Sequence, residues 1–312
     1  MKEVNQTLIK EFILQGLTND PDLQMPLFLV FILVYIITVL GNVGIIILIK
    51  ISPRLHTPMY FLLSNLSFAD LCCSSIVTPT MLIAFLSQRM VISLAGCAIQ
   101  MFLFVGMGST EVFLLTMMAY DRYIAVCKPL RYSVIMNNTM CLRLVVAAYS
   151  VAFLDALIQT NCTFRLNFCG SNEITHFYCD IPPMLKISCS DTGLNEAVLM
   201  CVAGGLIVAA LVIVLTSYTF IVAAILRIQS SDGRRRAIST CSTHFFCVTL
   251  LFGTLVFMYC RPRSQYSMDQ DRVASVFYML IIPMINPLIY SLRNQEVKLA
   301  LRKVGGRTCV LR

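Results

Sequence analysis

Four polar side chains interrupt long apolar stretches of the chain, and their types suit proton or cation binding. They are Asn42, Asp70, Glu111 and Asn286. A rise of about 1.5 Å per helical residue places all four near the middle of a membrane. A buried acid costs free energy unless it is paired, so we expect these side chains to face one another and to share water, protons or a cation. A sodium ion held by Asn42, Asp70 and Glu111 is one candidate, and a satisfied polar plug is the alternative.

A second set of charged side chains stands where an apolar run ends abruptly in an acid, a base and a tyrosine, Asp121-Arg122-Tyr123. Charge is tolerated at a membrane boundary and basic residues collect on its inner side, so this stretch is typical of a helix leaving the bilayer toward the cytosol. Taken alone, Asp121 and Arg122 predict an interfacial ion pair. Asp155 is a further acid inside an apolar run, and the sequence does not name its partner.

Residue types that carry catalysis or bind metals do not form a set in this sequence. Cys241 to His244 and His176 to Asp180 each place a histidine near a cysteine, but the two histidines are expected on opposite sides of the membrane. We find no nucleotide-binding glycine loop, no metal-binding helix pair and no nucleophile elbow. The sequence therefore predicts no enzyme activity, no cofactor and no metal centre.

The composition indicates an integral membrane protein that is all-α. Of 312 residues, 58% are hydrophobic and 13% are charged, against about 25% charged in an ordinary soluble domain. The net charge of +8 does not indicate nucleic-acid binding, because the basic residues stand at the ends of apolar runs rather than in one patch. Seven runs are near or above the roughly 20 residues that span a bilayer as helix: about 26–49, 58–82, 94–126, 142–160, 197–228, 237–259 and 273–292.

The distribution of basic residues predicts the orientation of this seven-helix bundle, which occupies residues 26–292. The four connections assigned to the cytosol carry 16 of the 24 Lys and Arg residues, so the N-terminal segment 1–25 is expected outside. The glycosylation sequon at Asn5 then lies outside as well, and Asn161 is a second candidate. The tail 293–312 has apolar residues at helical spacing with bases between them, which predicts a short amphipathic eighth helix on the inner leaflet lipid.

Several motifs in one order give the chain a specific resemblance over almost its whole length. They are Gly41-Asn42, Leu55 to Leu62, Met118 to Cys127, Ser217-Tyr218, Arg236 to Cys241, and Pro283 to Tyr290 followed by Ser291 to Asn294. With these motifs the chain resembles a mammalian olfactory receptor, a rhodopsin-like seven-helix receptor coupled to a G protein. The resemblance implies a volatile odorant as ligand, a stimulatory olfactory-type G protein as partner, and a rise in cyclic AMP as output. It also implies the plasma membrane of sensory-neuron cilia as location.

The resemblance also implies roles for particular residues. Two disulfides, Cys97–Cys179 and Cys169–Cys189, would hold a lid over the outer mouth, and Arg122 would leave Asp121 on activation. The residues implied in activation and G-protein coupling are Asp121, Arg122, Tyr123, Tyr218, Asn286, Pro287 and Tyr290. Pro287 also removes a backbone hydrogen bond, which predicts a hinge there. Two departures from the family pattern are Phe252, where a tyrosine is usual, and the basic triplet 234–236, which is expected to alter basal coupling.

Carried over position by position, the family's ligand cavity would be almost wholly apolar. Its lining would be Met101, Phe104, Val105, Gly108, Ser109, Val202, Ala203, Leu206, Phe252, Leu255, Val256, Tyr259, Val276 and Met279. Ser109 and Tyr259 are the candidate hydrogen-bond partners. Phe104 stands where amine receptors of the wider class carry an acid, which argues against a biogenic amine. Burial at roughly 25 cal/mol per Å2 predicts micromolar affinity for a small, moderately apolar ligand.

Two other classes of protein compete with a receptor. A membrane transporter or channel would use Asp70 and Glu111 as its ion path, and the same two acids leave this alternative open. A membrane enzyme would need a catalytic set, which the sequence does not supply.

Overall fold

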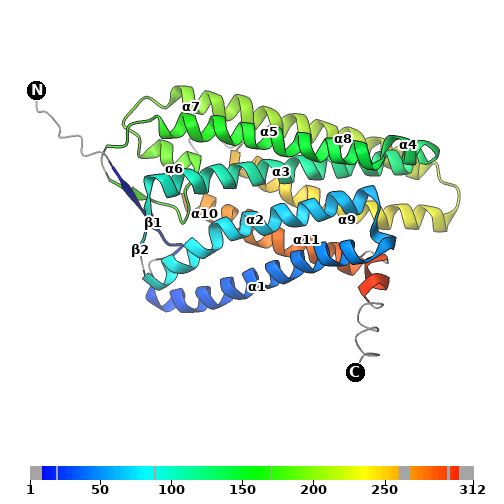
Figure 1. Cartoon of the computed structure of the whole chain (residues 1–312), viewed down its shortest axis with the longest axis horizontal. Coiled ribbons are helices and arrows are strands. Elements are labelled where there is room, and N and C mark those ends of the chain that lie inside the picture. Colours follow the sequence, from blue (N-terminus) through cyan, green and yellow to red (C-terminus); the bar gives the residue numbers. More distant parts are fainter. Residues whose placement is uncertain are drawn as a thin grey trace, which may run out of the picture.

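A computed structural model describes residues 9–18, 20–87, 89–169, 171–259, 268–293 and 296–301 of the chain. Seven helical segments in these ranges are long and apolar enough to cross a membrane, and Figure 1 shows them packed side by side as one bundle. The predicted all-α seven-helix fold is confirmed. The segments are α1 (Pro21–Ile51), α2 (Pro58–Ser87), α3 (Leu94–Cys127), α5 (Asn138–Phe164), α7 to α8 (Gly193–Leu226, with η3 at Leu199–Gly204), α9 (Ser231–Tyr259) and α10 to α11 (Met268–Arg293, with η5 at Phe277–Ile281).

Most of these helices extend beyond the apolar runs from which the spans are predicted. For α1 and α5, a polar residue before the first turn explains the extension, because a side-chain acceptor satisfies a backbone N–H group that has no partner inside the helix. The side chain of Asp20 accepts from the backbone of Asp22, and that of Asn137 accepts from Met140. The expected starts near 26 and 142 therefore move to Pro21 and Asn138.

The third span, α3, is the central element of the bundle. It contacts α2, α5, α8 and α9, and its buried residues run from its first turn to its last. A close approach between α3 and α5 depends on Gly106, since a Cβ atom there would meet the ring of Phe153 at 2.9 Å. The main hydrophobic cluster gathers around this helix, and many large side chains on the outer helix faces remain exposed, as expected of a lipid-facing surface.

A small sheet closes the end of the bundle at which β1 and β2 lie (Figure 1). Its strand order is β2-β1-β3, with β1 (Glu11–Gln15) antiparallel to β2 (Arg89–Ser93) and parallel to β3 (Glu173–Ile174). Phe12 and Leu14 of β1 are fully buried in a second hydrophobic cluster. The N-terminal segment is therefore part of the folded lid, which the polar composition of residues 1–25 does not predict.

Short helices and a disulfide-linked loop complete the two ends of the bundle. The lid carries α6 (Ile181–Lys186), and the opposite end carries η1 (Pro53–Leu55), η2 (Pro129–Arg131) and α4 (Tyr132–Ile135). Residues 296–301 are helical, and Val297 and Ala300 pack into the main cluster. The predicted amphipathic eighth helix stays a prediction, and the sequon at Asn5 lies outside the described part of the chain.

Candidate functional site

A cavity of about 520 Å3 lies between α3, α5 and the η3–α8 segment. Its wall contains seven of the side chains expected from the resemblance: Phe104, Val105, Gly108, Ser109, Ala203, Leu206 and Leu255. Ile181 of the lid helix α6 also lines it, so the cavity lies beneath the lid. The ring of Phe104 packs edge-on against Tyr178 and Tyr278, with centroids 5.1 and 6.0 Å away. The arrangement can hold a small, largely apolar molecule.

The other expected lining residues lie elsewhere in the structure. Met101 is buried in the second cluster beneath the lid, and Phe252 and Met279 are buried in the main one. Val256 is 40% exposed on the outside of α9, and the side chain of Tyr259 lies outside the described residues. Val202 and Val276 also do not line this cavity.

Two residues that were not expected in the lining, Asp155 and Gln159, add to the polar part of the wall beside Ser109. Asp155 and Gln159 of α5 both line the cavity. Ser109 donates to one carboxylate oxygen of Asp155 over 3.2 Å, and Gln159 donates to the other over 3.3 Å. Ser109 and Gln159 are therefore the partners of Asp155, which the sequence alone did not identify. They also weaken the argument against amines drawn from Phe104, because a carboxylate reaches the cavity from a different helix.

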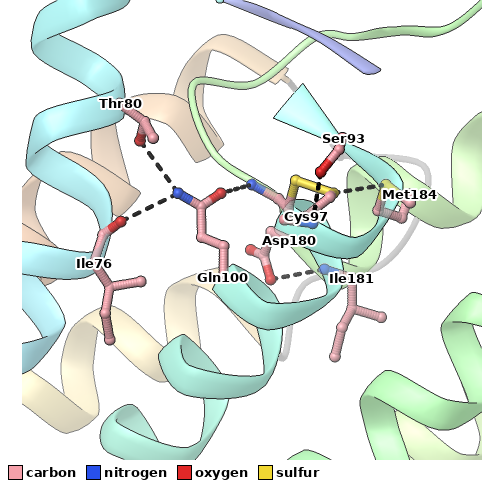
Figure 2. The surroundings of a disulfide bond; sticks show 10 residues. Ile76, Thr80, Ser93, Cys97, Gln100, Asp180, Ile181 and Met184 are labelled. Atoms are coloured by element: carbon pink, nitrogen blue, oxygen red, sulfur yellow. Dashed lines mark hydrogen bonds between the residues drawn. A yellow bond between two sulfur atoms is a disulfide. The ribbon is translucent and has the colours of Figure 1, made fainter. Parts of the chain in front are cut away.

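The lid is fixed to the top of the bundle by covalent and hydrogen bonds. Both disulfides that the resemblance implies are present, Cys97–Cys179 and Cys169–Cys189. Gln100 lies beside the first of them, where its side-chain oxygen accepts the Cys179 N–H over 3.0 Å (Figure 2). The amide group of the same side chain donates to α2, at the Ile76 carbonyl and the Thr80 hydroxyl, both over 3.2 Å. One side chain thus connects α2, α3 and the lid.

Two buried titratable groups of the lid have strongly shifted pKa values. Burial, reinforced by the positive charge of Arg272, lowers the pKa of His176 to about 3. Burial raises the pKa of Asp180 to about 6, although the N–H of Ile181 and the hydroxyl of Tyr178 both donate to its carboxylate. At neutral pH the closed lid therefore holds a neutral histidine and a predominantly ionised acid.

Three of the four buried polar residues named from the sequence, Asp70, Glu111 and Asn286, lie together inside the bundle. The fourth, Asn42, bonds to α11, the helix that carries Asn286. Asn286 donates to Asp70 over 3.0 Å, Glu111 lies within hydrogen-bonding reach of Asp70, and Asn42 donates to the carbonyl of Pro283 on α11 over 2.9 Å. One side-chain oxygen of each of these four residues is buried without a hydrogen-bond partner among the described residues. Unpaired carboxylate and amide oxygens fit a hydrated sodium ion or bound water.

Two separate groups of polar contacts involve the far parts of α3, α8 and α9. Asp121 lies 3.7 Å from Arg122 and accepts a hydrogen bond from the hydroxyl of Tyr132 over 2.8 Å. The hydroxyl of Tyr218 lies 2.7 Å from Nδ1 of His244, whose Nε2 lies 3.1 Å from the Leu115 carbonyl. His244 thus connects three helices. From the sequence, His244 was considered only as a metal ligand. A lone histidine within an apolar run was the signal that could have indicated a buried contact between helices.

The remaining residues implied in activation lie near these contacts or on α11. Tyr123 packs beside Phe220 of α8, with ring centroids 5.7 Å apart. Tyr290 is buried in the main cluster, and Pro287 lies so close to α1 that a Cβ atom on Gly41 would meet it at 3.0 Å. These are packing contacts, and the roles of the residues in activation stay predictions.

The chain is similar to curated proteins of one family over nearly its full length. The family model described as "Olfactory receptor" matches residues 31–305. Olfactory receptor 8U3 of Mus musculus is 53% identical over 303 residues, which cover 97% of this chain and 95% of that protein. Olfactory receptor 8U3 of Homo sapiens is 52% identical, covering 99% and 95%, and Olfactory receptor 5AR1 of Mus musculus is 50% identical, covering 98% and 99%.

Proposed function

The chain belongs to the olfactory receptor family, and on that premise we propose that it binds its odorant in the cavity between α3, α5 and α8. Membership makes it an odorant receptor and a multi-pass plasma-membrane protein rather than an enzyme. The finer proposal is that the odorant is small, volatile and mainly apolar. Its binding activates a stimulatory, olfactory-type G protein, which raises cyclic AMP. The proposed setting is the ciliary membrane, with the N-terminus outside and the C-terminus in the cytosol.

The observation that carries the ligand proposal is the cavity itself. Its volume of about 520 Å3 lies within the range of small-molecule sites, and its wall is apolar apart from a few side chains of α3 and α5. Burial of a small apolar molecule at roughly 25 cal/mol per Å2 gives weak binding once the cost of association is subtracted. Micromolar affinity is therefore the expected range.

The contacts at the opposite end support an activation mechanism. The Tyr218–His244 contact joins α8 to α9 and would have to break if the ends of these two helices moved apart. Asp121 and Arg122 are neighbours on α3, so their ion pair would open through a change in the conformation of the Arg122 side chain. A ligand shifts this equilibrium only by binding the moved arrangement more tightly. Arg122 would then leave Asp121 and contact the G protein, while Asn286, Pro287 and Tyr290 of α11 rearrange behind it.

The buried polar cluster fits a cation that stabilises the resting arrangement. Asn42, Asp70 and Glu111 each keep one oxygen without a partner among the described residues, and these oxygens would hold a sodium ion with its water. The glycan proposal rests mainly on Asn5. Asn161 is exposed, but it lies in the last turn of α5, close to the membrane.

The experiment that tests the receptor mechanism is the substitution Arg122→Ala. Surface staining of a tagged receptor should be unchanged, whereas odorant-evoked cyclic AMP should be lost, because the G-protein contact is removed. Arg131→Ala is the matched control, since Arg131 is an exposed base in the neighbouring η2 turn. Signalling that survives Arg122→Ala at normal surface level contradicts the proposed mechanism.

A further inference from the structure

Among the described residues that line the cavity, Asp155 is the one that carries a carboxylate. The side chain is only 2% exposed, yet it lines the cavity from α5, beside Ser109 of α3, while the η3–α8 segment supplies most of the other lining residues. An ionisable group in a membrane interior is costly unless another group compensates its charge. A carboxylate in an otherwise apolar wall is therefore expected to have a group nearby that compensates its charge.

The partners that the protein supplies do not compensate a charge. The Ser109 hydroxyl and the Gln159 amide are both neutral, and each donates to a different carboxylate oxygen. Among the described residues, Asp155 forms no ion pair with a Lys, Arg or His side chain. Each carboxylate oxygen accepts one of these hydrogen bonds and has capacity for another, so Asp155 can accept a further donor.

We propose that Asp155 anchors odorants whose polar end donates hydrogen bonds, with a primary alkylammonium group as the best fit. This inference rests on the proposed function of the cavity and specifies the chemistry of its ligand. An ammonium group brings the missing positive charge and three donors, and charge-assisted bonds of this kind are among the strongest in proteins. Leu206 and Leu255 face the same space and would cover the alkyl tail.

The geometry also disfavours odorants whose polar end only accepts. Against an ionised Asp155, a ketone or an ether would place its oxygen next to the carboxylate oxygens, and neither side would supply a proton. The two neutral donors, Ser109 and Gln159, are already directed at Asp155. The expected order of potency for one alkyl chain is therefore amine, then alcohol, then methyl ether.

The experiment compares hexylamine, 1-hexanol and hexyl methyl ether on cells that express the tagged receptor and a cyclic AMP reporter. On the wild type, hexylamine should have a half-maximal concentration roughly tenfold to hundredfold below that of the ether. Asp155→Asn should remove this preference and leave the ether response in place. Asp191→Asn is the matched control, since Asp191 is an exposed acid outside the cavity, and it should keep the preference for the amine.

The outcomes separate the ligand chemistry from the receptor function. A hexylamine response that is equally potent on the wild type and on Asp155→Asn overturns the inference. A wild type that responds to the ether but not to the amine also overturns it and leaves the proposed function standing. A wild type that reaches the surface and stays silent to a broad odorant panel contradicts the proposed function itself.

A second comparison keeps the inference testable if Asp155→Asn does not reach the surface. Asp155→Glu keeps the carboxylate on a longer side chain, so it should keep the preference for the amine at reduced potency. The wild-type comparison of hexylamine with the ether needs no variant. Equal potency of these two probes on the wild type overturns the inference.

Discussion

Acidification is expected to act on the lid through two groups whose effects oppose each other. His176 has a pKa of about 3 in the closed lid, so it stays neutral at pH 5, whereas the same residue in an unfolded lid would be protonated below about 6.5. Its contribution to stability is complete above pH 6.5 and is lost as the pH falls toward 3. Between pH 7 and pH 5 this loss amounts to about 2 kcal/mol of the free energy of unfolding.

Asp180 changes the stability in the other direction. Its pKa of about 6 in the folded protein lies above the ordinary value of 3.8, so the closed lid takes up a proton before the unfolded lid does. Its contribution is complete below pH 3.8 and is lost as the pH rises through 6. Between pH 7 and pH 5 the gain is about 1 kcal/mol, which leaves the wild type with a net loss below about 1 kcal/mol.

Two single substitutions separate these effects, and their results should have opposite signs. In Asp180→Asn the His176 effect remains alone, so the purified receptor should lose about 2 kcal/mol between pH 7 and pH 5. In His176→Gln the receptor should gain about 1 kcal/mol over the same interval. The measurement is the thermal unfolding midpoint of each variant at the two pH values, compared with itself. Midpoints that move in the same direction in both variants would refute the reasoning.

Three further substitutions test other contacts. Cys179→Ser opens a disulfide that spans 82 residues and is expected to cost about 4 kcal/mol, so surface staining should fall sharply. Tyr132→Phe removes a hydrogen-bond donor from Asp121 and so destabilises the resting ion pair with Arg122. Basal cyclic AMP should rise. An unchanged basal level would mean that this contact has no part in the mechanism. Gly106→Val forces α5 away from α3 and should lower thermal stability by about 1–3 kcal/mol, whereas Gly44→Ala meets no atom within 4 Å and should be tolerated.

The sequence predicts the seven helices well, because each span must satisfy its own backbone hydrogen bonds within the membrane and must therefore be long and apolar. It predicts the sheet poorly. β1 is only five residues long, and its partners β2 and β3 follow far along the chain, so no local pattern marks the pairing. The alternation of Phe12 and Leu14 was the one signal present, and it is too short to be distinctive.

Some residues of the candidate site could be predicted from the sequence and others could not. Residues of α3 such as Phe104 and Ser109 reach the cavity as the resemblance implies, because a long central helix keeps its register. Val256 and Phe252 do not, since a small rotation of α9 moves a side chain from the cavity to the lipid face or into the core. The role of Asp155 depends on which face of α5 meets α3, and that follows from packing that the sequence does not encode locally.

The position of β1 between β2 and β3 has a consequence for biosynthesis. On the proposed topology the N-terminal strand crosses the membrane first, but its partners at residues 89–93 and 173–174 are made much later. At about 5–20 residues per second, translation separates β1 from β3 by roughly 8–30 s. During that interval Phe12 and Leu14 are without the cluster that buries them in the finished protein, so they are a ready binding site for lumenal chaperones. The three-stranded sheet can therefore form only after more than half of the receptor has been synthesised.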